Sequence, residues 1–473
     1  MHSISAVRSA GGAATYFAKD DYYTGAGTAE FSAWGGKGAA TLGLDGEVEK
    51  QPFQDLLKGQ LPDGMLVNQV EGRRIGLDLT FSMPKSASVL ALVGGDARLL
   101  TAHRDAVRET MGWVEKNHAE VRSYERGRNG EPVRSGNLVW AMFEHDTSRK
   151  LDPQSHIHVV VAAISQAVDG NWRALFNGAI WSANAMIGSV YHAQFREKVE
   201  ALGYRTELSG KHGQFEISDV PEKVTRAFSQ RREEILERVE ALGIQSPKGQ
   251  DAVVLGTRDN KVDVEDRPAL YRQWEERAAA LGFDGKAMVA AAVARAPEPG
   301  LPLQPVRISA QAQKAVETAL PTLSLWLQPS DPLTTNGLRR LTLSPAEIRT
   351  EMAVASAIRI LGQREAAFGL QDIAKTALDL GLANVTITRL EQRIDKLMAL
   401  GQLIPGKSER LDGVVMQVTT PEHLQLERQL LAAIDAGRGE GSDSDIMRQR
   451  TDFVIGDRGS LLDLRQSHDD LRH

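Results

Sequence analysis

Three histidines stand where their imidazoles could share one metal ion. His156 and His158 lie two residues apart in the apolar run HIHVVVAAIS, and residues i and i+2 of a β-strand point to the same face of a sheet. His145 ends the preceding apolar run, NLVWAMFEH, which predicts a strand that returns through a short connection. Three neutral imidazoles with open positions suit a catalytic divalent metal. We therefore expect one divalent ion here, Mg²⁺ or Mn²⁺, at a set that other transition metals could also bind.

An H-x-H pair on a strand also arises by chance, so the pattern alone does not establish a metal site. A cupin-type site needs a Glu a few residues after the pair, whereas the next Glu after His158 is Glu197. A barrel amidohydrolase needs ligands on later strands, and His192 and His212 lie in a predicted helix and a predicted turn. The other histidines are interpreted as surface or tail residues: His2, His103, His118, His423, His468 and His473.

Three of the seven tyrosines cluster near the N-terminus, at Tyr16, Tyr22 and Tyr23. Tyrosine can act as a covalent nucleophile, but its ordinary pKa of about 10 leaves little phenolate at neutral pH. A three-histidine metal would help by binding phosphate oxygens and drawing charge from the phosphorus. For the tyrosines taken alone, packing along an amphipathic segment is the competing interpretation.

The bulk composition is that of an ordinary globular protein. The 473 residues predict two to four domains, with 42% hydrophobic and 25% charged residues. The net charge of −6 does not indicate a nucleic-acid binder, although DNA contact needs only a local basic surface. The absence of cysteine excludes disulfides, cysteine-ligated zinc and a cysteine nucleophile. No signal peptide or membrane span is evident, so we expect a cytoplasmic protein without membrane insertion.

The elements that must position these residues form a mixed helix-and-strand region over 1–295. Leu77, Leu79 and Phe81 alternate with polar residues, which predicts a strand over 75–83. Asn129-Gly130 predicts a hairpin turn. The other expected elements are a helix over 97–119, strands over 137–145, 156–165 and 172–175, a helix over 186–202, a hairpin over 204–217 and one helix over 221–242.

The remainder of the chain differs in composition. A proline-dense stretch, PEPGLPLQP, predicts a linker over 296–344. Helices over 345–362, 370–380 and 387–400, followed by a strand over 414–418, predict a winged-helix-like domain over 345–437. The tail over 438–473 is expected to be disordered.

A phosphate-loop pattern begins at Gly401 and ends at Lys407-Ser408. That loop needs a strand before it and a helix after it. Here a predicted helix precedes it with Gly401 as its cap, Pro405 interrupts it and a strand follows. We therefore reject a nucleotide-binding loop at this position.

In their order along the chain, these features resemble the conjugative relaxases of the TrwC/TraI (MOBF) type, in the HUH endonuclease class. The resemblance covers about residues 1–290. The matching stretches are SISAVRSAGGAATYFAKDDYY (3–23), WGGKGAATLGL (34–44), LDLTFSMPKSAS (77–88), FEHDTSRKLDPQSHIHVVV (143–161), WRAL (172–175), GYRTELSGKHGQFEI (203–217) and FSQRR (228–232).

The resemblance implies an α+β fold, with a central antiparallel sheet flanked by helices and the active site on one sheet face. It implies site- and strand-specific nicking and strand transfer at a plasmid origin of transfer. One tyrosine would attack the scissile phosphodiester, join the enzyme to the 5′ end and leave a free 3′-OH, which initiates conjugative DNA transfer.

The family's functional positions match particular residues here. Tyr16 matches the primary nucleophile, and Tyr22, with Tyr23 beside it, matches the second. Phe17 stands where many members have a further tyrosine, so it cannot be a nucleophile. Asp78 matches an acidic residue expected to orient a metal-bound histidine or to accept the nucleophile's proton. The histidines that match the metal ligands are His145, His156 and His158.

The resemblance also implies contact with single-stranded DNA beside a hairpin, which needs cations along a groove and aromatic platforms. Ordinary surface charge is the alternative for each cation. Arg122, Arg126, Arg128 and Arg134 form a basic hairpin that we expect to follow the duplex arm. Candidate DNA-binding residues are Arg8, Trp34, Lys37, Lys85, Arg149, Arg173, Arg231 and Arg232.

Further partners that the resemblance implies are relaxosome accessory proteins, a type IV secretion coupling protein and a separate helicase. The chain is expected to lack its own motor domain, as a natural short form, a truncated gene or a fragment, and to travel with the DNA into a recipient cell. Two alternatives stay open: a rolling-circle replication initiator, whose tyrosine usually follows the histidines, and a non-catalytic, metal-stabilised, autoregulatory DNA-binding protein.

Overall fold

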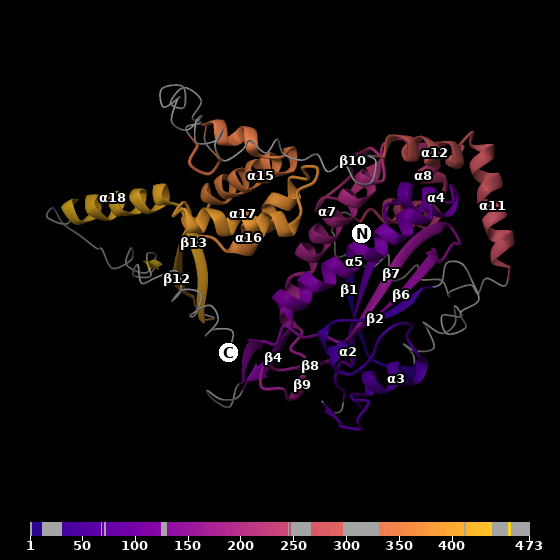
Figure 1. Cartoon of the computed structure of the whole chain (residues 1–473), viewed down its shortest axis with the longest axis horizontal. Helices are drawn as coiled ribbons and strands as arrows, with labels where there is room; N and C mark the ends of the chain where they lie inside the picture. The colour runs from indigo at the N-terminus through magenta and orange to yellow at the C-terminus, as the bar shows by residue number, and fades with distance from the viewer. Residues whose placement is uncertain are drawn as a thin grey trace, which may run out of the picture. The chain divides into compact units, whose positions relative to one another are not determined.

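The computed structural model describes residues 2–11, 31–67, 69–70, 72–123, 130–244, 246, 266–296, 331–335, 337–410, 413–437 and 453–455. The chain divides into two compact units, one that ends at Pro297 and one that begins at Glu298 (Figure 1). Within the described residues, no helix has both the length and the apolar character needed to cross a membrane.

The first unit is built on a five-stranded sheet in the order β1-β3-β7-β6-β2. Every neighbouring pair of strands in this sheet is antiparallel. This confirms the predicted central antiparallel sheet. The strands are β1 (His2–Val7), β2 (Ser32–Gly35), β3 (Gly76–Ser82), β6 (Trp140–Thr147) and β7 (Pro153–Ala162).

One face of the sheet is covered by helices. The apolar residues of β3 are fully buried on this face, and Phe81 meets Tyr191 with ring centroids 5.2 Å apart. Tyr191 belongs to α7 (Asn184–Ala201), which packs against β1 and against α5 (Ala97–His118). The helix α4 (Lys85–Leu92) packs against β7. These helices bury the apolar half of each alternating strand, as the period of two predicts.

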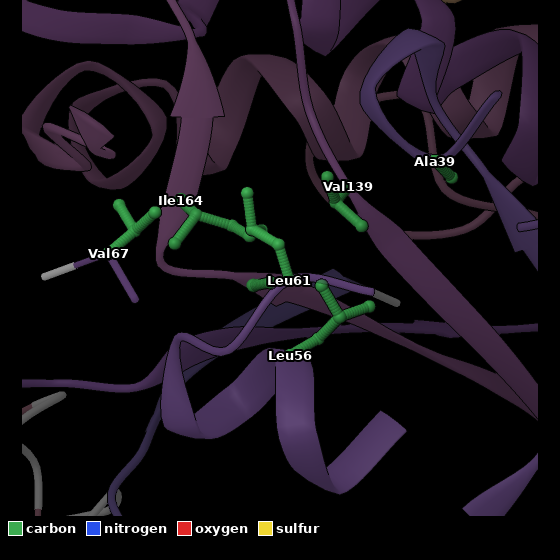
Figure 2. Packing of buried hydrophobic residues seen from close by; sticks show 7 residues of the cluster. Ala39, Leu56, Leu61, Val67, Val139 and Ile164 are labelled. Carbon is green, nitrogen blue, oxygen red and sulfur yellow. The ribbon is translucent and has the colours of Figure 1, made fainter. Parts of the chain in front are cut away.

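On the opposite face of the sheet, α3 (Lys50–Lys58) and the residues around it cover one end of the strands. Phe53 and Leu57 of α3 pack against Phe143 and Val160 of the central strands. A second cluster joins α3 to the strand ends, and Figure 2 shows Leu56, Leu61 and Ile164 beside one another in it, with Ala39 to one side. It consists of Ala39, Leu56, Leu61, Val67, Val139, Ala162 and Ile164. The histidines lie toward the other end of the same face.

Smaller elements complete the first unit, and they confirm the hairpin predicted over 204–217. Of the other predicted hairpin, two strands pair, whereas Arg126, Arg128 and Asn129 lie outside the described residues. β4 pairs with β5, β8 with β9, and β10 with β11. Their bounds are β4 (Glu120–Ser123), β5 (Glu131–Arg134), β8 (Ile164–Gln166), β9 (Trp172–Ala174), β10 (Thr206–Leu208) and β11 (Phe215–Ile217), and the remaining helices are α2 (Lys37–Thr41), α6 (Gly178–Ser182), α11 (Arg267–Ala280) and α12 (Gly285–Arg295).

Two expectations need correction. The single helix predicted over 221–242 is wrong: α8 (Glu222–Ala227) and α9 (Gln230–Ala241) are separate, because Phe228 is fully buried and Ser229 has a non-helical backbone. The surface assignment is wrong for His103 and His118, which are buried on α5. Both histidines lie on the face of α5 that packs inward, alongside its apolar residues.

Among its described residues, the second unit contains a group of three helices followed by a β-hairpin. The helices are α15 (Pro345–Gly362), α16 (Leu370–Asp379) and α17 (Ile387–Ala399). A capping box between Ser344 and Glu347, with proline at the first helical position, explains where α15 begins. The other described elements are η1 (Gly337–Thr342), β12 (Ile404–Arg410), β13 (Gly413–Thr419), α18 (Pro421–Gly437) and β14 (Phe453–Ile455).

The phosphate-loop pattern lies in this hairpin. Gly401 adopts a left-handed backbone, with φ of 68°, directly after α17. Pro405 to Ser408 are part of β12, which pairs with β13. A strand therefore occupies the place where a helix would have to begin, which confirms that this is not a nucleotide-binding loop. Of the tail predicted to be disordered, only β14 lies within the described residues, where it pairs with β12.

Candidate metal centre

The structure brings the three predicted metal ligands together on one sheet face. His145 and His156 are directly opposite each other in the β6–β7 ladder, and His158 lies two residues further along β7. The ring centroids are 4.9 Å apart for His145 and His156, 5.0 Å for His145 and His158, and 5.2 Å for His156 and His158. Imidazoles arranged tetrahedrally around one ion, with metal–nitrogen distances of about 2.1 Å, would have centroids roughly 5 Å apart.

Hydrogen bonds behind two of these rings determine which nitrogen faces the cluster. Both carboxylate oxygens of Asp78 lie 2.9 Å from Nδ1 of His158, and the hydroxyl of Thr80 lies 3.2 Å from the same nitrogen. Nδ1 of His156 lies 3.0 Å from the carbonyl oxygen of Gln154. When Nδ1–H donates to an oxygen, Nε2 carries the lone pair that a metal needs. The donor set therefore fits a divalent ion bound through Nε2 atoms.

As the side chains stand, no group of three or more His, Asp or Glu residues in the described part of the chain meets the geometry of a completed metal centre. The feature that fits a shared ion is the spacing of the rings of His145, His156 and His158, whose centroids lie 4.9 to 5.2 Å apart.

Directly behind the histidines, the helix-covered face holds a buried polar network that sequence reasoning missed. Glu144 is 2% exposed; its carboxylate accepts a hydrogen bond of 2.7 Å from Nε of Arg104 and one of 3.3 Å from the Ser155 hydroxyl. Nδ1 of His103 lies 3.4 Å from the same hydroxyl. Burial raises the pKa of Glu144, against the opposing effect of Arg104. Alternation alone could have placed Glu144 and Ser155 on this face.

The predicted nucleophiles cannot be placed. Tyr16, Tyr22 and Tyr23, together with Phe17, lie outside the described residues. The strand that precedes them, β1, pairs with the Asp78-bearing strand β3 throughout its length.

The predicted DNA-binding residues are distributed over several elements. Nζ of Lys85 donates a 3.0 Å hydrogen bond to the carbonyl oxygen of Pro153, at the start of β7. Burial lowers the pKa of Lys85 to about 8, although Asp152 and Glu216 oppose this. Arg149 lies in the connection between β6 and β7. These two cations therefore belong to the segments that adjoin the histidines.

The other candidates lie on different elements. Trp34 is half-buried on β2, with its ring 6.3 Å from that of Phe53. Arg173 lies on β9 and donates a 2.8 Å hydrogen bond to the carboxylate of Asp169. The four remaining candidates are Arg8, Lys37 and Arg232, which are exposed, and Arg231, which is half-buried. The structure does not bring this whole set to one place near the histidines.

Arg173 also lines a hollow that the sequence did not indicate. Its volume is about 450 Å³. The guanidinium of Arg122 lies over the ring of Phe176, 4.5 Å from its centroid. Cations and aromatic rings thus meet in one hollow, whose lining includes none of the three histidines. Its lining consists of Leu66, Val67, Arg122, Trp172, Arg173, Ala174, Leu175 and Phe176.

The fold and the site together define a mixed α/β protein with a histidine cluster on one face of an antiparallel sheet. The model of the TrwC relaxase family matches residues 10–281. Because this match covers more than half of the 473 residues, the chain belongs to the TrwC relaxase family.

Similar proteins agree with this placement. The chain is 37% identical over 427 residues to the multifunctional conjugation protein TraI of Escherichia coli, and 36% identical over 428 residues to the TraI of Escherichia coli strain K12. Each alignment covers 87% of this chain but only 22% of the relative. The chain thus spans about a fifth of the length of these curated relatives.

Solved structures of the conjugative relaxase TrwC have the same fold. A copper-bound complex of TrwC with oriT DNA is 38% identical, with a TM-score of 0.56, and covers 60% of this chain and 100% of that one. A complex of TrwC with a 27-mer DNA comprising the recognition hairpin and the cleavage site is 37% identical, with a TM-score of 0.54 and the same coverage.

Proposed function

We propose that this chain is a metal-dependent DNA relaxase that nicks one strand at a plasmid origin of transfer and transfers that strand through a covalent 5′-phosphotyrosine intermediate. The observation that carries the proposal is the cluster of His145, His156 and His158, with Asp78 behind His158, in a chain of the TrwC relaxase family. The similar TrwC structures contain oriT DNA and, in the copper complex, a bound metal.

The three histidines would hold one divalent ion, Mg²⁺ or Mn²⁺, through their Nε2 atoms. When bound, the ion supplies Lewis-acid stabilisation of charge on the scissile phosphate. Asp78 has two candidate roles, and its geometry favours positioning over proton acceptance, because both of its oxygens already lie 2.9 Å from Nδ1 of His158. Its carboxylate holds the ring in one tautomer and strengthens the ligand.

Tyr16 would be the primary nucleophile. A bond forms between its phenolic oxygen and the phosphorus, the bond from phosphorus to the 3′ oxygen breaks, and the phenolic proton passes to a base while the 3′ oxygen gains a proton. The phosphodiester of the DNA is replaced by a phosphodiester to tyrosine, so the DNA strand can be rejoined without an external energy source.

Tyr22, with Tyr23 beside it, would carry out the second transfer. The name of the relatives as conjugation proteins supports a role in conjugation.

The partners proposed for this activity follow from the same family. They are single-stranded DNA with an adjacent hairpin, relaxosome accessory proteins, a type IV secretion coupling protein and a separate helicase. Lys85 and Arg149 adjoin the histidines and would contact the DNA strand near the nick, whereas Arg122 and Arg173 would bind DNA further from the nick.

We further propose a cytoplasmic location, a linker over 296–344 and a winged-helix-like domain over 345–437.

A cleavage assay tests the proposal. Single-stranded oligonucleotide from the cognate transfer origin is incubated with the protein and Mg²⁺ or Mn²⁺, and a covalent protein–DNA adduct is measured on a denaturing gel. We expect an adduct with the wild type, none with Tyr16→Phe, and initial cleavage intact with Tyr22→Phe. His156→Ala should lose cleavage while still binding the oligonucleotide. If the wild type forms no adduct, the proposal that the chain is a DNA-nicking enzyme is wrong. If an adduct still forms when both Tyr16 and Tyr22 are replaced, the assignment of the nucleophile is wrong.

A further inference from the structure

The connection between the strands that carry His145 and His156 is irregular. His145 pairs with His156, but the next pair is Thr147 with Pro153, so two residues of β7 oppose Asp146 alone. Such a bulge bends the strand locally and redirects nearby side chains. The ligand pair therefore stands at the last regular position before a distortion, where its geometry depends on what holds the connection in place.

The connection itself contains a strained residue. Leu151 has φ of 57°, in the left-handed region that non-glycine residues rarely adopt. Its N–H donates to the carbonyl oxygen of Ser148, and the N–H of Ser148 donates to the carbonyl oxygen of Asp152. A left-handed non-glycine residue persists only where surrounding contacts over-determine it. Here the contacts include these hydrogen bonds within the connection and further ones from outside it.

The helix α11 supplies contacts at both ends of this irregular segment. Nη1 of Arg267 donates to Oδ2 of Asp146 at 2.7 Å, and the hydroxyl of Tyr271 donates to the same oxygen at 2.6 Å. Nε1 of Trp274 donates to the carbonyl oxygen of Leu151 at 2.8 Å. The spacing of four and then three residues places all three donors on one face of α11. Figure 1 labels α11 and β6.

At the far side of the connection, Nη1 of Arg277 on α11 donates to Asp152 at 3.3 Å, and the start of β7 is held by other elements. Lys85 donates to the carbonyl oxygen of Pro153, Gln154 donates to that of Met83, and the N–H of Met83 donates to that of Ser155. These contacts fix where β7 begins. None of these contacts involves Asp146, at the end of β6, whose carboxylate is hydrogen-bonded by α11.

We propose that α11 is a strap that positions the metal ligands, with Arg267, Tyr271 and Trp274 as positioning residues. Asp146 follows His145 directly and is 4% exposed. A buried carboxylate is stable only where donors reach it, so α11 fixes the position of Asp146 near the end of β6. Because His145 is the preceding residue, this also fixes the direction of the His145 ring. The proposal rests on the metal site proposed above, and it adds that the affinity of that site depends on a helix about 120 residues away in the chain.

Metal affinity measured on the full chain tests the strap. Mn²⁺ binding is followed by titration calorimetry for the wild type, Tyr271→Phe, Arg267→Met and the double variant, with thermal unfolding of the metal-free proteins alongside. Partners behind metal ligands typically contribute 10- to 100-fold in affinity. We expect about 10-fold weaker Mn²⁺ binding for each single variant and about 100-fold for the double variant. Arg272→Met is the matched control, because Arg272 is exposed on the same helix.

The outcomes separate the strap from the proposed function. Weakened Mn²⁺ binding in the strap variants, with the control unchanged and all proteins folded, supports the strap. Wild-type affinity in a folded Tyr271→Phe and Arg267→Met, even with a lowered Tm, overturns it, since that would be a purely structural role. If a variant does not fold, the conservative Tyr271→Phe decides alone. A wild type that binds no Mn²⁺ overturns the strap and the metal site together.

Discussion

The two faces of the β6–β7 ladder hold different chemistry at the same position along the strands. On one face His145 and His156 stand opposite each other, with rings 4.9 Å apart. One residue away on each strand, Glu144 and Ser155 point to the other face, where the carboxylate of Glu144 accepts hydrogen bonds from the Ser155 hydroxyl and from Arg104. On the helix-covered face the carboxylate of Glu144 accepts hydrogen bonds from Arg104 and Ser155, whereas the other face gathers three imidazoles. We infer that the face with Glu144 stabilises the folded protein and that the face with His145 and His156 binds the proposed ion.

The sharpest test of this comparison exchanges the neighbours Glu144 and His145 for alanine. Glu144→Ala should lower the free energy of unfolding by about 3–5 kcal/mol, because it leaves the partly buried guanidinium of Arg104 without this carboxylate. His145→Ala should weaken Mn²⁺ binding more than about 100-fold, above the effect of partners behind a ligand. Urea unfolding and titration calorimetry measure the two effects. Equal loss of metal affinity in a folded Glu144→Ala would show that the faces do not act separately.

A smaller effect is expected from the residue that supports a ligand from behind. Asp78→Asn should weaken Mn²⁺ binding by roughly 10- to 100-fold, since the amide no longer accepts a charge-assisted hydrogen bond from His158. Thr80→Val is the matched control, because the Thr80 hydroxyl lies further away, at 3.2 Å from the same nitrogen. An effect of Thr80→Val as large as that of Asp78→Asn would argue against a special role for the carboxylate.

The smallest effect concerns pH and the helix-covered face. Burial, the largest cause, holds the pKa of His103 well below its ordinary 6.5. In the unfolded chain His103 binds a proton near pH 6.5, whereas in the folded protein it stays unprotonated at that pH. The free energy of unfolding therefore falls as the pH drops below about 6.5. His103→Gln should lose less stability than the wild type between pH 7 and pH 5 in urea unfolding. His118 and His192, with pKa values lowered to about 4 and about 3 chiefly by burial, act in the same direction. An unchanged pH dependence would mean that His103 is protonated in the fold.

Much of the site could be predicted because its signal is local. The period of two placed His156 and His158 on one face, and the alternation around Asp78 predicted the strand that carries it. The return of the chain through a short connection placed His145 opposite His156. Each inference needs only residues that are close in sequence. The match of the family model over residues 10–281 agrees with the resemblance drawn from the same motifs.

Other features could not be predicted, because they depend on contacts between distant segments. The break between α8 and α9 follows from the burial of Phe228, whereas the charged sequence reads as one continuous helix. His103 looks like a surface residue in a charged helix, and only the packing of α5 shows that it is buried. The hollow that joins Arg122 to Arg173 forms from separate hairpins.

The sequence by itself determined the histidines of the proposed site, their spacing and the strands that present them, since side-chain direction along a strand is a local property of the backbone. The tertiary structure decided what stands behind and beside those histidines: Arg104 on Glu144, and α11 on Asp146, each from an element far away in the chain. A buried charge is satisfied by whichever donors the fold brings to it, and their identity cannot be read from the strand that carries the charge.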